Sequence, residues 1–335
     1  MFPAARLNLG GNGILAWVLR RGLQTGLTLL LASALCFTII QWAPGDYLDT
    51  LEQNPTISPE TIAALRTQFG LDRPAVEQYF RWLSQVVRGN WGESFSYRQP
   101  VAQLLAERVP ATLLLSLVSL GVTWSVAIPL GIVAAVHQNR WPDRALQVFS
   151  YLLQGFPSFV LGLLLLFVAQ TSRLFPVGDM TSIDFADLTP LGKVVDVGWH
   201  LILPTLVLTL TSLAGLQRVM RGNLLDVLRQ DYIRTARAKG LPEHRVIYVH
   251  ALRNAINPLI TLLGFEFASL LSGAFITEYF FNWPGLGRLI LQAVTAQDLY
   301  LVMASLMMGA VMLIVGNLLA DLLLQWADPR ITAGR

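Results

Sequence analysis

The sequence predicts an all-α membrane protein with six transmembrane helices, and three observations predict this fold class. Of the 335 residues, 54% are hydrophobic and only 13% are charged, whereas soluble domains carry about 25% charged residues. Six stretches reach the ~20 mostly apolar residues that a helix needs to cross a bilayer. Helix start and stop residues bound the longer segments between these stretches. The net charge of +3 is too small to indicate nucleic-acid binding.

The six apolar stretches are almost free of charge. Four contain no charged residue, one contains only His200, and one contains a single acid, Glu266. The first stretch is longer than the apolar region of a secretory signal peptide, so we interpret it as an uncleaved span. We therefore predict spans at residues 22–43, 111–136, 145–171, 199–217, 255–277 and 299–320.

The distribution of basic residues predicts the orientation in the membrane. With the N-terminus inside, the inside segments hold 15 Lys and Arg residues and the outside segments hold 9. The contrast becomes 15 to 3 when the long first outside segment is left out, because long loops translocate largely regardless of charge. We therefore expect both termini to be cytoplasmic.

Residues 44–110, between the first two spans, predict a small helical extracytoplasmic domain. The triplet Ser58-Pro59-Glu60 supplies an N-cap, a first helical residue and a first-turn acid, and Gly70 suits the end of that helix. The apolar stripes on the helices of this domain can pack against each other and against the spans, or they can form a surface for an external partner. The two interpretations are compatible. Two further helices are expected, from Pro74 to Gly89 and from about Pro100 into the second span.

The segment between the fourth and fifth spans predicts a helix, a turn and a second helix. Gly240 suits a left-handed C-cap, and Pro242 and Glu243 suit the start of the second helix. Asn257-Pro258 is expected to cap and begin the fifth span. The predicted helices run from about Asn223 to Lys239 and from Pro242 to about Asn254.

This cytoplasmic segment is basic, and two roles are open for its charges. They can set the topology and contact anionic lipid headgroups, or they can belong to a docking element for a cytoplasmic partner. The capped turn at Gly240 favours docking, because a topology signal needs no defined fold.

The same segment resembles the EAA loop of the integral-membrane subunits of binding-protein-dependent ABC importers. The resemblance is closest to the dipeptide/oligopeptide/nickel branch and covers nearly the whole chain. In the loop it is carried by Asp231-Tyr232, Ala236-Arg237-Ala238-Lys239-Gly240-Leu241, His250-Ala251-Leu252-Arg253-Asn254 and Pro258. Elsewhere it is carried by Arg20-Arg21, Pro44-Gly45-Asp46, Gly70-Leu71-Asp72-Arg73-Pro74, Pro110-Ala111-Thr112-Leu113, Pro129-Leu130-Gly131, Pro157-Ser158-Phe159, Trp283-Pro284-Gly285-Leu286-Gly287-Arg288 and Asp328-Pro329-Arg330.

The loop departs from the general family pattern at two places. The pattern has Glu-Ala-Ala with Gly four residues after the second Ala, whereas this chain has Arg234-Thr235-Ala236 with Gly240 in place. Arg253 stands where the wider family often has Pro. These differences leave open which ATPase residues would meet Arg234.

The resemblance implies a pore subunit of an ATP-driven importer in a bacterial inner membrane. It implies a second, related permease subunit, two cytoplasmic ATPases that bind Mg-ATP, and an extracytoplasmic substrate-binding protein. The resemblance favours peptides as the substrate class, and nickel chelates or glycan fragments stay as alternatives. It divides the chain into residues 1–43, an extracytoplasmic domain 44–110, and a permease core 111–335 that includes the coupling loop 222–257.

Candidate functional residues follow from the resemblance and from polarity within the spans. Acids at membrane depth face protein or water, so Glu266 is a candidate pore-lining or interhelical residue, and Asp321 with Asn317 a candidate polar group near the inner surface. The late loop is a candidate contact for the binding protein, through Trp283, Pro284, Gly285, Gly287 and Arg288. The candidate ATPase-coupling residues are Asp231, Tyr232, Arg234, Ala236, Arg237, Ala238, Lys239, Gly240, Leu241, His250, Arg253 and Asn254.

The sequence offers no catalytic, cofactor or metal motif of its own. A P-loop needs Gly-Lys followed by Ser or Thr, and Gly192-Lys193 is followed by Val194. Two other classes stay as alternatives. An ion-driven secondary transporter would need internal repeats and paired intramembrane charges, and a membrane scaffold would not co-purify with ATPases.

Overall fold

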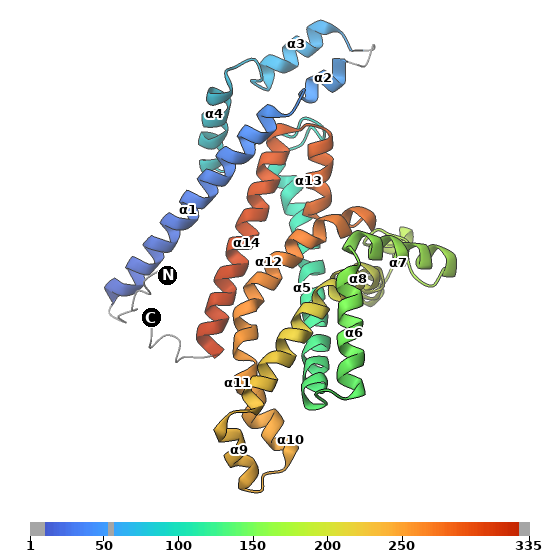
Figure 1. Cartoon of the computed structure of the whole chain (residues 1–335). Coiled ribbons are helices and arrows are strands. Elements are labelled where there is room, and N and C mark those ends of the chain that lie inside the picture. The colour runs from blue at the N-terminus through green and yellow to red at the C-terminus, as the bar shows by residue number, and fades with distance from the viewer. Residues whose placement is uncertain (1–10, 53–56, 328–335) are drawn as a thin grey trace. The chain divides into compact units, whose positions relative to one another are not determined.

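In the computed structural model, the described residues, 11–52 and 57–327, are almost entirely helical. Their one isolated bridge joins Glu93 and Pro100. The all-α expectation is therefore confirmed for this part of the chain (Figure 1). The motif Asp328-Pro329-Arg330 and the side chain of Asp321 lie outside the described residues.

Four described helices are long and apolar enough to cross a membrane, and a bent pair makes up to five. They are α1 (Gly11–Trp42), α5 (Val101–Val136), α8 (Pro190–Leu228) and α14 (Leu299–Ala327). The expected span 255–277 falls in α12 (Asn257–Phe280), several of whose side chains lie outside the described residues. The count of six spans therefore stays a prediction.

The expected continuous span at residues 145–171 is wrong in one respect, because it is broken. It consists of α6 (Trp141–Gly155) and α7 (Ser158–Ser172), which are bent by 97° relative to each other. Phe156 is extended, with φ −94° and ψ 122°. The ring of Pro157 disfavours helical geometry at the preceding residue and removes a backbone donor, so the apolar run cannot continue as one helix.

The described residues divide into two compact units. The first unit holds residues 113–283 and 315–327, and the second holds 11–112 and 284–314. The connection between α8 and α12 lies entirely in the first unit, and the segment between α1 and α5 lies entirely in the second.

The second unit contains the three helices expected after the first span, together with a short α2 (Tyr47–Glu52). In α3 (Pro59–Gln68), the Ser58 hydroxyl accepts a hydrogen bond from the Thr61 amide, which confirms the predicted N-cap. Next come α4 (Ala75–Val87), with Pro74 as its N-cap, and the start of α5. Gly70 and Gly89 adopt φ of +70° and +82° where these two helices end, a region that favours glycine.

A buried acid also orders the second unit, between α13 (Leu286–Thr295) and α14. Asp298 is fully buried and accepts hydrogen bonds from the Ser94 hydroxyl at 2.6 Å and the Ser96 amide at 3.0 Å. Its other carboxylate oxygen accepts from the Leu301 amide at 3.2 Å. These bonds satisfy a charge that would otherwise be costly to bury, and they fix the 94–96 loop to the start of α14.

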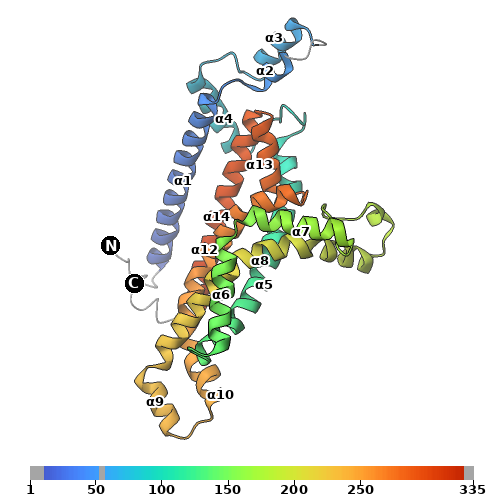
Figure 2. The same ribbon diagram turned by 45° about the vertical axis from the view of Figure 1, so that its right-hand side comes forward.

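The first unit is built on α8, which packs beside α6, α7 and α12. Its main core joins side chains of α5 and α8 to the connection that follows α8. That connection contains α9 (Asp231–Ala238), α10 (Glu243–Arg245), a π-helical turn at Val246–Ala251 and α11 (Leu252–Ala255). Figures 1 and 2 both show α9 and α10 next to each other, beyond the end of α11.

Candidate functional site

The connection begins with a break that the sequence analysis did not predict. The helix expected from Asn223 to Lys239 is instead two helices, because α8 ends at Leu228 and α9 starts at Asp231. Gln230 between them is extended, with φ −70° and ψ 150°, and its carbonyl accepts from the Ile233 amide at 3.1 Å. The change of direction lets Ile233 reach the core that α8 lines, which a straight helix would not allow.

The buried face of α9 fixes it in the first unit. Ile233 is fully buried and Ala236 is 8% exposed, and they lie three residues apart, on one face of the helix. Both join the core formed by Leu224, Met220 and neighbouring side chains of α8. The rest of α9 is exposed, so the helix presents a polar outer face on an apolar base.

The turn after α9 has the C-cap expected at Gly240. Gly240 has φ +76°, its amide donates to the Arg237 carbonyl at 2.9 Å, and the Leu241 amide donates to the Ala236 carbonyl at 3.4 Å. This pair of bonds is a Schellman motif. A Cβ built at Gly240 would meet nothing within 4 Å, so the backbone angle alone requires glycine here.

A charge-assisted pair closes the same turn. The Arg237 guanidinium donates from Nε to one oxygen of Glu243 at 3.1 Å and from Nη2 to the other at 2.6 Å. This contact lowers the pKa of the Glu243 carboxyl below its ordinary 4.5. The two side chains are 42% and 54% exposed, so solvent screens the pair and its net contribution is small.

We expect Glu243→Gln to lower the free energy of unfolding by about 0.5–1 kcal/mol at neutral pH. Because the folded-state pKa of Glu243 is lowered, its contribution is present above 4.5 and is lost as the pH falls through the lowered value. Thermal unfolding of the unsubstituted chain and of the Glu243→Gln variant, measured in detergent from neutral pH to below pH 4.5, checks the expectation. A difference that stays constant with pH would contradict a role for the charge.

The second half of the connection is not the regular helix expected from Pro242 to Asn254. A π-helical turn over Val246–Ala251 interrupts it, and Val246, Ile247 and Ala251 are buried there. Such turns widen the helix locally, and here the widening brings these side chains into the core of the first unit. Asn257 begins α12 rather than capping it, because Ile256 is the N-cap residue and Pro258 is the second residue.

A further side-chain hydrogen bond joins the two halves of the connection. The Asn254 amide nitrogen donates to the Tyr232 hydroxyl at 2.7 Å. Of the predicted coupling residues, the structure buries Ala236 and half-buries Leu241 and His250. The others are exposed: Asp231, Tyr232, Arg234, Arg237, Ala238, Lys239, Gly240, Arg253 and Asn254. The predicted residues thus share one compact element with a polar surface.

The candidate pore residues and the candidate binding-protein residues are partly or fully buried, and their burial does not identify a role. Glu266 on α12 and Asn317 on α14 are half-buried. In the late loop, Trp283 is fully buried, Gly285 and Gly287 are buried, and Pro284 and Arg288 are half-buried. Their roles stay predictions, and Pro284 and Arg288 are the two of these loop residues with exposed surface.

Sequence reasoning missed a buried ion pair of the first unit. The Asp143 carboxylate is fully buried and accepts from both Nε and Nη2 of Arg221 at 2.7 Å. It also accepts from the Asn139 amide at 2.9 Å and from Gln147 at 2.8 Å. The pair joins α6 to α8, so it holds the turn after α5 against the base of the connection. Two charges just beyond predicted spans, 78 residues apart, give no local sequence signal.

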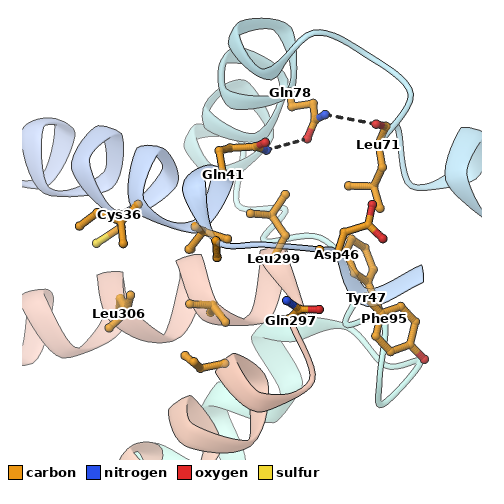
Figure 3. A pocket seen from close by; sticks show the side chains of 16 residues that line it. Cys36, Gln41, Asp46, Tyr47, Leu71, Gln78, Phe95, Gln297, Leu299 and Leu306 are labelled. Atoms are coloured by element: carbon orange, nitrogen blue, oxygen red, sulfur yellow. Dashed lines mark hydrogen bonds between the residues drawn. The ribbon is translucent and has the colours of Figure 1, made fainter. Parts of the chain in front are cut away.

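A largely apolar cavity of 340 Å³ lies in the second unit. Cys36, Leu299 and Leu306 form part of its wall, and Gln41 donates to Gln78 at 3.3 Å at one side (Figure 3). Its one carboxylate, Asp46, already accepts from Arg66 at 2.8 Å. The lining offers amide groups and apolar surface rather than a charged constellation. Among the described residues, no group of three or more His, Cys, Asp or Glu side chains could hold a metal ion.

Comparison with known proteins matches nearly the whole chain. A family model described as the binding-protein-dependent transport system inner membrane component matches residues 127–333. The model of the N-terminal part of such components matches residues 14–116. The oligopeptide transport system permease protein AppB of Bacillus subtilis is 39% identical over 318 residues, covering 94% of this chain and 99% of that protein.

Two further relatives give the same result. A putative peptide permease protein of Brucella ovis is 40% identical over 316 residues, covering 92% of this chain and 97% of its own. The glutathione transport system permease protein GsiC of Escherichia coli K12 is 37% identical over 320 residues, which cover 95% of this chain and 99% of that protein. With a family model across more than half of its length and relatives across almost all of it, the chain belongs to the inner-membrane permease components of binding-protein-dependent ABC importers, in the peptide/nickel branch.

Proposed function

We propose that the chain forms part of the pore of an ATP-driven peptide importer and that residues 231–254 couple the pore to separate ATPases. The relatives named above are described for oligopeptides, peptides and glutathione, so the peptide bond is the chemistry their names share. Peptides are therefore the proposed cargo. An ion-driven transporter or a scaffold accounts less well for membership of this family.

The observation that carries the coupling proposal is the contrast between the two faces of α9. Its inner face is fixed by Ile233 in the core that contains α8, its outer face exposes Arg234, and the C-cap residue Lys239 is also exposed. A partner that grips the outer face would therefore move the end of α8 with it, because packed side chains transmit strain rather than absorb it. Such movement shifts the equilibrium between two packings of the membrane-spanning helices that form the pore.

The proposed assembly has two permease subunits, this chain and a related one, and two cytoplasmic ATPases that bind Mg-ATP. Closing of the ATPase dimer moves the two connections as rigid bodies, and the spans open outward. The six apolar stretches support six spans, and the charge asymmetry of the sequence supports an orientation with both termini and the connection in the cytoplasm. Residues 44–110 and the loop ending at Arg288 then receive the external binding protein, and Glu266 faces the pore or a neighbouring helix.

The test replaces Gly240 by Val and measures ATP-driven peptide uptake in liposomes that hold the complete importer. A β-branched residue at φ +76° costs about 1–2 kcal/mol, which lowers the ratio of formed to unformed turn by roughly five- to thirtyfold. We expect uptake and transport-linked ATPase stimulation to fall together.

The matched control is Gly240→Asn, because asparagine tolerates the left-handed region and a Cβ here meets no neighbour within 4 Å. Asn should retain most of the uptake that Val loses. Normal uptake and normal ATPase stimulation in the Val variant would refute the coupling role of this turn.

A further inference from the structure

A row of buried hydroxyl groups lies where α5 and α8 meet in the first unit. The Thr209 hydroxyl donates to the Ser119 backbone carbonyl at 3.5 Å, which places the two helices in contact at this level. Further along, a Cβ built at Gly131 of α5 would lie 2.6 Å from Cβ of Met220 on α8, so the contact continues. Residues three or four apart share one face of a helix, and on that basis five residues form what we name the hydroxyl seam. They are Ser116, Ser119 and Thr123 of α5 with Thr205 and Thr209 of α8.

The hydroxyls of the seam are buried, yet they are almost without hydrogen bonds. The exposed fraction is 0% for Ser116, Ser119 and Thr123 and 6% for Thr205. Within the described part of the chain, none of these four hydroxyls has a hydrogen-bond partner. A buried hydroxyl without a partner is destabilising, because it has given up its bonds to water. Native proteins contain few such groups, so four of them in one helix contact require an explanation.

Hydroxyls on other helical residues of the chain are satisfied by a carbonyl one turn back in the same helix. Thr211 on α8, only two residues after Thr209, donates to the Val207 carbonyl at 3.1 Å. The same kind of bond is made by Ser33, Thr38, Thr67, Thr171 and Thr295. The seam hydroxyls make no such bond, and this leaves them available to a partner that enters the contact between α5 and α8.

The rest of this contact has a different chemistry. Beyond the seam, Ala127 and Ile132 of α5 join Leu213 and Leu216 of α8 in the apolar core. Separating the helices there would expose apolar surface to water, which is unfavourable. Separating them at the seam would instead supply the missing hydrogen bonds. Because the closed chain already buries the seam, water reaches these hydroxyls only when α5 and α8 move apart.

We propose that the hydroxyl seam opens during the transport cycle and that Ser116, Thr123 and Thr205 then line the aqueous path through the pore. A hydroxyl both donates and accepts, which suits water and also the N–H and C=O groups that every peptide carries. The opening corresponds to one of the two packings between which ATP binding shifts the pore. Because the ATPases would drive it, this role rests on the proposed function above.

The test uses the complete importer in nanodiscs, where a charged, membrane-impermeant thiosulfonate reagent reaches both faces of the membrane. Cys36 is the single cysteine of the chain, so Cys36→Ala gives a background without thiols in this chain. Ser116→Cys and Thr205→Cys are introduced into that background separately. The mass of the permease chain then gives the rate of modification without nucleotide, with Mg-ATP, and with Mg-ATP and vanadate.

We expect both cysteines to react faster in one of the nucleotide conditions. The reagent needs a thiolate in water, so a cysteine that faced only acyl chains would stay unreactive. A conformation populated at about 10% or less that becomes dominant raises the rate about tenfold or more. If either variant does not fold, Thr123→Cys gives the same comparison at the third position.

The matched control is Ala214→Cys in the same background. Ala214 is fully buried on α8, but it lies about 180° around the helix from Thr205, so its rate should not change with nucleotide. An equal increase at Ala214 and at the two seam positions would indicate a general loosening of the fold and would overturn the proposal.

Rates that stay low in every condition would also overturn it, provided that the same variants retain ATP-driven uptake in liposomes. The hydroxyls would then be assigned to permanently bound water, and the proposed function would stand. Absence of ATP-driven uptake by the unsubstituted importer would instead refute the proposed function, so the two failures are distinguishable.

Discussion

Arg221→Leu is expected to lower the free energy of unfolding by about 3–5 kcal/mol, since it leaves a buried carboxylate without its partner. Asp143 is fully buried and receives two of its hydrogen bonds from Arg221. The remaining donors, Asn139 and Gln147, do not neutralise the charge. Thermal unfolding in detergent, followed by circular dichroism, measures the loss.

A second substitution separates the charge from the packing. Asp143→Asn combined with Arg221→Leu removes both charges and keeps an acceptor for the Asn139 amide. Replacing both members of a buried pair is often close to neutral, so the double variant should recover most of the loss. Arg144→Leu, at an exposed position, should change little. If the double variant were as unstable as Arg221→Leu, the loss would come from packing rather than from an unpaired charge.

Ile233→Ala is expected to cost about 2–5 kcal/mol, the range for removing a large aliphatic side chain from a packed core. Ile233 is fully buried among side chains of α5 and α8. Because this loss falls at the contact between α9 and α8, we expect ATP hydrolysis to continue while peptide uptake falls. The two rates, measured on the same liposomes that hold the complete importer, give the ratio of peptide transported to ATP consumed.

The matched control for this substitution is Val249→Ala. Val249 lies in the same connection and is 57% exposed, so truncating it should change neither rate appreciably. An unchanged transport ratio in Ile233→Ala, with the expected loss of stability, would mean that force reaches α8 by another route.

Local signals in the sequence predicted those features that depend on a few adjacent residues. The Ser58 cap and the left-handed Gly240 follow from the chemistry of single positions, and the structure has both. The apolar runs predicted membrane-crossing helices because hydrophobicity along the chain is enough to define them. Coupling roles stay predictions, because they depend on a partner surface.

Features set by tertiary packing were not predictable in the same way. The break at Gln230 and the π-helical turn at Val246–Ala251 exist because Ile233 and Ile247 pack into a core made by distant helices. The Asp143–Arg221 pair and the buried Asp298 likewise join residues far apart in the chain. The break at Pro157 was not predicted either, because residues 145–171 form one apolar run, and the 97° bend at the break has no signal in hydrophobicity.

The elbow between α6 and α7 also bears on how the importer must be assembled. Each arm has 15 residues, or roughly 22 Å of helix, so neither arm alone spans the ~30 Å hydrocarbon layer. Non-helical backbone at that depth is tolerated only where protein covers it or water reaches it, and Phe156 at the corner is 50% exposed in the isolated chain. Where this corner lies within the hydrocarbon layer, acyl chains must be kept away from it, either by neighbouring protein or by an aqueous vestibule open to one side of the bilayer.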